Sequence, residues 1–234
     1  MEIFDKIADE VLKGNSAPVE ELVNEALSQD ISAEKILNKG LVGGMSIVSE
    51  KFKNNEIFIP EVLVSARAMN SGMEILKPLL AEANVKSIGK VVIGTVKGDL
   101  HDIGKNIVAM MLQGAGFDVV DLGTGVSKEK FLEFVEKESA DILGMSTLLT
   151  TTMVYMKEVI EALKNANLEQ NVKVIIGGAP VTQSYAVQIN ADGYAPDAAS
   201  AVDLTKKLLK KGSHLDCRNG PHYHGKGKNS YKRL

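Results

Sequence analysis

Cysteine, long apolar runs and an excess of either charge are all scarce in this chain of 234 residues. Its one cysteine, Cys217, excludes an intramolecular disulfide and fits a reducing cytoplasm, which is the predicted location. No apolar run approaches membrane-spanning length, and the first residues lack the pattern of a signal peptide, so we expect neither. The formal net charge of −3 gives no general reason to expect nucleic-acid binding. Length and composition predict an ordinary globular protein of one large domain or two small ones.

The first 80 or so residues show only helical periodicity. Apolar residues recur at helical spacing in stretches near 3–12, 19–27, 36–52 and 60–77. Ser32 is the expected N-cap of the third helix, and Pro78 is expected to end the fourth. Gly40, Gly43 and Gly44 interrupt the third stripe, which predicts a close helix contact or a kink there. Four helices with short connections predict a small bundle.

After Val85 short apolar runs alternate with helical stretches. The predicted strands are 91–96, 119–122, 142–145, 174–176 and 193–195. The predicted helices are 103–115, 127–138, 152–166, 181–189 and 198–211. This alternation is typical of an α/β fold, with a parallel sheet covered on both faces. Five strands fit the flavodoxin-like, Rossmann-like order 2-1-3-4-5.

Three segments follow from these patterns. We expect a four-helix cap domain at 1–85, a Rossmann-like domain at 90–211 and a disordered basic tail at 212–234. The tail holds four potential metal ligands: His214, Cys217, His222 and His224. They lack the paired spacing of a zinc site and have no fold to hold them, so we interpret them as incidental.

The loop after the first predicted strand is the most informative segment, because it places a histidine between two aspartates. It reads Gly98-Asp99-Leu100-His101-Asp102-Ile103-Gly104. At the carboxyl edge of an open α/β sheet, where ligands bind, Asp99 could accept the Nδ1–H of His101 and leave Nε2 free to bind a metal. No second histidine or cysteine of this domain completes a protein-made metal site. This favours a metal that brings its own equatorial ligands, such as a macrocycle, over an ordinary helix-start histidine.

Two further loops at the same edge carry unusual composition. The segment 146–152 has five hydroxyl residues out of seven, more than a helix cap needs. Gly177 and Gly178 follow the fourth strand, where a tight turn or a wall against a flat ligand would need them. The histidine, the hydroxyls and the two glycines therefore lie after strands 1, 3 and 4.

Asp99-x-His101-x-x-Gly104, Ser146-x-Leu148 and Gly177-Gly178 together resemble the cobalamin-binding signature of methionine synthase and related corrinoid proteins. The resemblance covers about residues 2–211 and includes the helical cap. It implies that cobalamin binds base-off, with His101 as the lower axial cobalt ligand and Asp99 as its hydrogen-bond partner. Thr152 stands where methionine synthase has a serine that completes a relay. The residues expected at the cofactor are Asp99, Leu100, His101, Asp102, Ile103, Gly104, Ser146, Leu148, Thr150, Thr152, Gly177 and Gly178, with Met69 and Met73 of the cap on the opposite corrin face.

The resemblance implies a corrinoid methyl carrier of one-carbon metabolism, a component of a methyltransferase system rather than a complete enzyme. Its implied partners are a substrate:corrinoid methyltransferase, a second methyltransferase acting on tetrahydrofolate or coenzyme M, and a reductive activase. Nucleic acid and membrane are not among the expected partners. A cobalamin-responsive regulator and the small subunit of an adenosylcobalamin mutase are alternatives. A response-regulator-like domain would leave the three loops unexplained.

Overall fold

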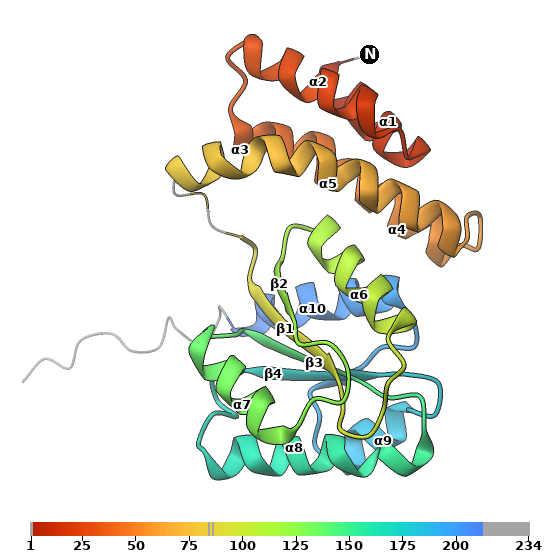
Figure 1. The fold of residues 1–234 in the computed structure, drawn as a ribbon, viewed down its shortest axis with the longest axis vertical. Helices are drawn as coiled ribbons and strands as arrows, with labels where there is room; N and C mark the ends of the chain where they lie inside the picture. The colour runs from red at the N-terminus through yellow and green to blue at the C-terminus, as the bar shows by residue number, and fades with distance from the viewer. Residues whose placement is uncertain (1, 84, 86, 213–234) are drawn as a thin grey trace, which may run out of the picture.

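The computed structural model describes residues 2–83, 85 and 87–212, and it consists of a helical unit followed by an α/β unit (Figure 1). The helical unit contains α1 (Ile3–Lys13), α2 (Ser16–Ser28), α3 (Ala33–Lys35), the π-helix η1 (Ile36–Leu41), α4 (Val42–Lys53) and α5 (Ile59–Glu82). The α3, η1 and α4 segments follow one another without a break and correspond to the third predicted helix. The expected helical N-terminal region is therefore confirmed.

Two of the three glycines of the third helix mark a close helix contact, as predicted, and one of these lies in a local change of helix type. Gly40 lies within the π-helix, and a Cβ there would approach Ile7 to 2.9 Å. A Cβ on Gly44 would approach Val11 to 2.8 Å. Side chains at these positions would hold α1 away from η1 and α4.

One local prediction in this unit was wrong. Helix α5 does not end at Pro78 but continues to Glu82. Proline removes one backbone donor, yet buried Leu76 and Leu80 anchor the helix on both sides of it in the apolar core. Ser32 occupies the N-cap position of α3, as predicted, although its side chain makes no capping hydrogen bond.

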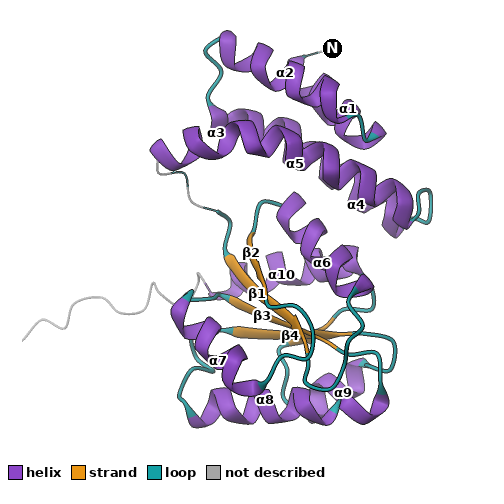
Figure 2. Ribbon diagram, viewed as in Figure 1, coloured by secondary structure: helices purple, strands orange, loops and turns teal. Residues whose placement is uncertain are grey.

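The α/β unit is a five-stranded parallel sheet with helices on both faces (Figure 2). Its strands are β1 (Lys90–Thr95), β2 (Asp118–Asp121), β3 (Ile142–Ser146), β4 (Lys173–Gly177) and β5 (Gly193–Tyr194). Its helices are α6 (Ile103–Gly114), α7 (Lys128–Lys137), the 3₁₀ turn η2 (Thr150–Thr152), α8 (Val154–Asn165), α9 (Gln183–Gln188) and α10 (Ala198–Gly212). The strand order β2-β1-β3-β4-β5 confirms the predicted topology.

The central strands are buried on both faces, and successive residues point to opposite sides of the sheet, so two apolar clusters form. Val92 and Leu143 face α7, α8 and α9, whereas Val91 and Ile142 face α6, α10 and the helical unit. The cluster that contains Val91 and Ile142 is continuous with the core of the helical unit. One sheet face is therefore covered by α6 and α10. The helical unit packs against the same two helices (Figure 1).

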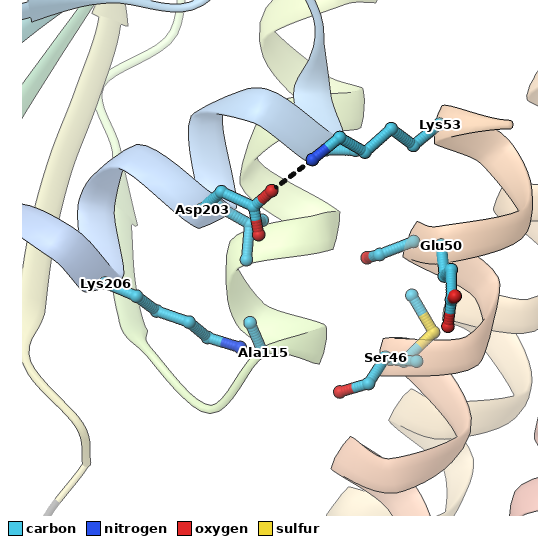
Figure 3. Close-up of a pocket in the computed structure, with 10 residues that line it drawn as sticks. Ser46, Glu50, Lys53, Ala115, Asp203 and Lys206 are labelled. Atoms are coloured by element: carbon cyan, nitrogen blue, oxygen red, sulfur yellow. Dashed lines mark hydrogen bonds and ion pairs between the residues drawn. The ribbon is translucent and has the colours of Figure 1, made fainter.

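The contact between the two units combines a close apolar approach with an ion pair. Buried Met45 of α4 lies where a Cβ on Gly114 of α6 would come within 2.9 Å of it. Lys53 and Asp203 form a 2.6 Å ion pair between α4 and α10, beside a cavity of about 200 Å³ (Figure 3). Both ion-pair residues are more than half exposed, so the apolar contact contributes most to this packing.

The described residues contain no helix long and apolar enough to cross a membrane. The predicted tail ligands His214, Cys217, His222 and His224 lie outside the described residues, and α10 extends to Gly212.

Candidate functional site

The three unusual loops meet at one edge of the sheet because all five strands are parallel. His101 follows β1, and segment 146–152 follows β3, the neighbouring strand. The chain leaves β1 toward β2 on one side and leaves β3 toward β4 on the other. The gap between the β1 and β3 loops is therefore the topological switch point, where open α/β sheets bind ligands.

His101 and Asp99 form a hydrogen-bonded pair in that gap. The imidazole Nδ1 lies 2.7 Å from Asp99 Oδ1, and the backbone N–H of His101 donates to the same oxygen at 3.0 Å. Because an ionised carboxylate only accepts hydrogen bonds, Nδ1 carries a proton, and in the neutral imidazole the lone pair is therefore on Nε2. The His101 side chain is 54% exposed, whereas that of Asp99 is fully buried. This geometry suits a metal ligand oriented by a buried carboxylate.

Hydrogen bonds keep Asp99 ionised. Burial raises the pKa of this carboxyl, but the combined donors around it outweigh burial and hold the pKa well below its usual range. On Oδ2, the Leu148 N–H donates at 2.6 Å and the Thr147 hydroxyl at 2.9 Å. The Leu149 N–H adds a third donor at 3.2 Å.

The loop that carries His101 is fixed from both sides. The hydroxyl of buried Thr95, the last residue of β1, donates to the carbonyl of His101 at 2.9 Å. The Gly125 N–H donates to the carbonyl of Asp99 at 3.0 Å. Gly98, with a φ of +79°, makes the turn that leads from the strand into the loop. His101 is therefore held on a rigid support rather than on a free loop.

A cavity of about 670 Å³ opens beside His101 and extends between the sheet and helices α6 and α10. Ser146, Gly177 and Gly178 line it, as the sequence predicts for a bound ligand. Gly178 has a φ of +121°, and a Cβ there would lie 1.8 Å from the carbonyl oxygen of Thr147. This position therefore excludes every other residue and lets the two loops meet at the cavity wall.

An apolar rim surrounds the histidine. Leu100 is 77% exposed, Ile103 73% and Leu148 44%. Gly104, in the first turn of α6, would have open space around a Cβ. Exposed leucine and isoleucine each gain about 1.5–3 kcal/mol on full burial, so this rim favours a large apolar surface laid over it. Asp102, the N-cap residue of α6, is exposed beside the rim.

The structure separates other predicted site residues from this cavity. Thr150 is exposed in η2, and Thr152 is buried beside Asp99 rather than at the cavity wall. Met69 and Met73 line a different cavity, of about 610 Å³, between the helical unit and the α/β unit. Phe52, near the end of α4, lines the cavity beside His101 instead.

Some site residues were missed by sequence reasoning. Thr147 is buried and bonded to Asp99, and only the density of hydroxyls in its loop pointed to it. Lys105 of α6 is buried at the cavity and pairs with Asp121 at the end of β2 at 2.5 Å. Gly144 of β3 also lines the cavity, and a glycine inside a strand is a signal for close approach.

The donor set and the cavity fit a corrinoid. His101 offers one nitrogen ligand, and the described residues include no group of three potential metal ligands that could enclose an ion by themselves. A flat macrocycle would cover the apolar rim beside the cavity of about 670 Å³.

Comparisons with known proteins also point to a corrinoid site. Two family models, both for a B12 binding domain, match residues 89–203 and 3–77. A corrinoid protein of Desulfitobacterium hafniense is 42% identical over 90% of this chain and 99% of its own length. Dimethylamine corrinoid protein 1 of Methanosarcina acetivorans is 43% identical over 89% of this chain and 98% of its own.

A solved structure resembles this chain over both the helical unit and the α/β unit. A chain of the methanol:cobalamin methyltransferase complex of Methanosarcina barkeri superposes with a TM-score of 0.82 and 32% identity, covering 94% of this chain and 85% of that one. Fold, site and relatives together define a cobalamin-binding protein with a helical N-terminal region. The chain belongs to the corrinoid protein family, which confirms the resemblance predicted from its three loops.

Proposed function

We propose that this chain is a corrinoid methyl carrier that binds its cofactor base-off, with His101 Nε2 as the lower axial ligand of cobalt. The observation that carries the proposal is the pairing of an exposed imidazole with a buried, ionised carboxylate, at the mouth of a cavity rimmed by apolar side chains. When bound, a corrinoid supplies a cobalt centre that takes up and releases a methyl group.

The residues of the chain would bind, orient and shield the cofactor. His101 gives an axial ligand whose orientation and proton are set by Asp99. Leu100, Ile103 and Leu148 would cover the corrin on the side of His101 and keep water from it. Ser146, Gly177 and Gly178 line the cavity that would hold the nucleotide tail. Leu148 has two roles: its backbone N–H donates to Asp99, and its side chain is part of the apolar rim.

The helical unit would serve as the cap of the upper corrin face. Phe52 of α4 lines the cavity, and Phe58 and Ile59, at the start of α5, are exposed. We propose these three as upper-face candidates alongside the expected Met69 and Met73. Covalent labelling of exposed side chains, with and without cofactor, would distinguish the two sets. The residues at the upper corrin face should become protected when the cofactor binds, and the others should not.

The partners follow from the carrier role. One methyltransferase would load a methyl group from a methylated amine, methanol or a methoxylated aromatic compound. A second would transfer it to tetrahydrofolate or coenzyme M, and a reductive activase would restore the cofactor. The relatives named for dimethylamine and for the methanol:cobalamin complex support a methyltransferase as the partner class.

Retention of a corrinoid tests the binding step. Purified protein is incubated with hydroxocobalamin, passed through a desalting column and examined by visible spectroscopy. We expect the wild type to retain the cofactor with a histidine-ligated spectrum, and His101→Ala to lose that spectrum until imidazole is added. Exposed Lys157→Ala of α8 is the control and should match the wild type. Folded wild type that retains no corrinoid would overturn the proposal.

The carrier step needs a separate assay. Protein loaded with methylcobalamin is mixed with a methylcobalamin:coenzyme M or tetrahydrofolate methyltransferase, and loss of the methyl–cobalt absorbance is followed. Transfer much faster than from free methylcobalamin is the expected result. No acceleration with either acceptor enzyme would exclude the carrier role and favour a regulator or a mutase subunit.

A further inference from the structure

Two buried threonine hydroxyls lie beside Asp99 on the side away from His101. Thr147 is 1% exposed and Thr152 is 5% exposed. Thr147 Oγ1 lies 2.9 Å from Asp99 Oδ2, whereas Thr152 Oγ1 lies 3.2 Å from it. The two hydroxyl oxygens are themselves 2.5 Å apart. The relay implied by the resemblance contains only Thr152, so the position of Thr147 has to be explained.

The count of hydroxyl protons decides which threonine bonds to Asp99. Each hydroxyl has one proton to donate, and two oxygens at 2.5 Å repel each other unless a proton lies between them. One of the two protons therefore lies on the contact between Thr147 and Thr152. The other can go to the carboxylate of Asp99 or to the carbonyl of Leu149, which lies 2.9 Å from Thr152 Oγ1 and 3.3 Å from Thr147 Oγ1.

The distances favour Thr147 as the donor to the carboxylate. If Thr147 donates to Asp99, the contact left without a proton is the longer one, 3.2 Å from Thr152 to Asp99. If Thr152 donates instead, Thr147 Oγ1 faces the carboxylate at 2.9 Å with lone pairs only. If Thr152 donates to the Leu149 carbonyl at 2.9 Å, Thr147 must donate to Thr152, and Thr147 Oγ1 again faces the carboxylate at 2.9 Å with lone pairs only. A bond to the charged carboxylate is also stronger than one to a neutral carbonyl.

We infer that the relay runs Thr152–Thr147–Asp99–His101, and that Thr147 is a positioning residue that sets how strongly Asp99 accepts the hydrogen bond of the imidazole. The hydrogen bonds themselves need no cofactor. Their consequence for cobalt ligation rests on the proposed function.

Competition between donors gives the expected direction of the effect. Thr147 and His101 donate to opposite oxygens of one carboxylate, so each weakens the hold of Asp99 on the other's proton. The Leu148 N–H stays in place because it belongs to the backbone. Removal of the Thr147 hydroxyl alone therefore strengthens the bond between Asp99 and the Nδ1–H of His101.

Nuclear magnetic resonance of the cofactor-free, ¹⁵N-labelled protein tests this inference. The Nδ1–H signal of His101, identified by its loss in His101→Gln, is recorded about two pH units above the ordinary histidine pKa of about 6.5. Thr147→Val removes the hydroxyl at nearly constant volume, and we expect the signal to move downfield. Thr152→Val leaves the Thr147 donor in place and should shift the signal less.

Thr147→Ser separates the hydroxyl from packing. Serine restores the donor but lacks the methyl group, so its signal should return to the wild-type position, whereas a packing defect would persist. Thr147→Ala gives the same comparison if valine disturbs the fold. An equal or larger shift in Thr152→Val, an unchanged or upfield signal in Thr147→Val, or no recovery with serine would overturn the inference.

The two failures are distinguishable. If folded wild type retains no corrinoid, the proposed function falls, while the order of the relay stands on the cofactor-free spectra. If the wild type retains the corrinoid but Thr147→Val leaves the Nδ1–H signal unchanged, only the inference about Thr147 falls.

Discussion

Replacement of Asp99 by asparagine tests whether the buried carboxylate organises the site before any cofactor binds. An amide offers one acceptor oxygen instead of two. If that oxygen faces Thr147 and Leu148, the NH₂ group faces the backbone N–H of His101, which loses its 3.0 Å bond. A lost bond to a charged acceptor costs about 1.5–3 kcal/mol, and the conversion of the remaining bonds from charged to neutral adds about 1–2 kcal/mol. We expect Asp99→Asn to lower the free energy of unfolding by about 3–5 kcal/mol.

The same substitution has a defined pH dependence. Since the folded-state pKa of Asp99 lies below its unfolded value of about 3.9, ionisation stabilises the wild type above that pH. This contribution is lost as the pH falls through the folded-state pKa. The difference between the two proteins should therefore be constant near neutral pH and shrink below about pH 3.9.

Urea unfolding of cofactor-free protein, followed by circular dichroism, measures both effects. Asp102→Asn is the control because it makes the same change of charge in the same loop, at an exposed residue whose side chain accepts only a 3.2 Å bond from Asn106. It should cost less than about 1 kcal/mol. Equal losses for the two variants would refute the account of Asp99.

Two glycine substitutions give further predictions. Gly178→Ala places a Cβ 1.8 Å from the Thr147 carbonyl oxygen at a φ of +121°. We therefore expect the loops after β3 and β4 to separate and the variant to lose corrinoid retention. Retention equal to that of the wild type would contradict the close approach of the two loops. Gly114→Ala should gain up to about 1 kcal/mol of helix propensity but crowd Met45, and thus raise hydrogen exchange in α4 without disturbing the sheet. Unchanged exchange in α4 would show that the helical unit does not depend on this contact.

Much of the fold was predictable because its signals are local. The strands are short apolar runs, the helices carry apolar stripes, and parallel strands bring the loops after β1, β3 and β4 to one edge. His101 and Asp99 lie two residues apart, so their pairing could be predicted from the sequence.

The features that the sequence did not predict depend on contacts between distant residues. Helix α5 continues through Pro78 because the leucines on both sides of it are buried in the apolar core. This burial depends on other helices and cannot be predicted from the local sequence. Thr147 bonds to Asp99 across 48 positions of sequence, and the geometry of β1 and β3 alone selects it from its hydroxyl-rich neighbours. Likewise, the arrangement of the cap on α6 and α10 determines that Phe52, rather than Met69, lines the cavity of His101.

The most direct test of the central claim is electron paramagnetic resonance of the cob(II)alamin-loaded protein with ¹⁵N-labelled histidine and unlabelled cofactor. If a histidine of the chain is the axial ligand, each cobalt line is split into two by the ¹⁵N nucleus, and the splitting is lost in His101→Ala. If the lines remain split into three by ¹⁴N, the cofactor has kept its own base on cobalt, and the proposed role of His101 is contradicted.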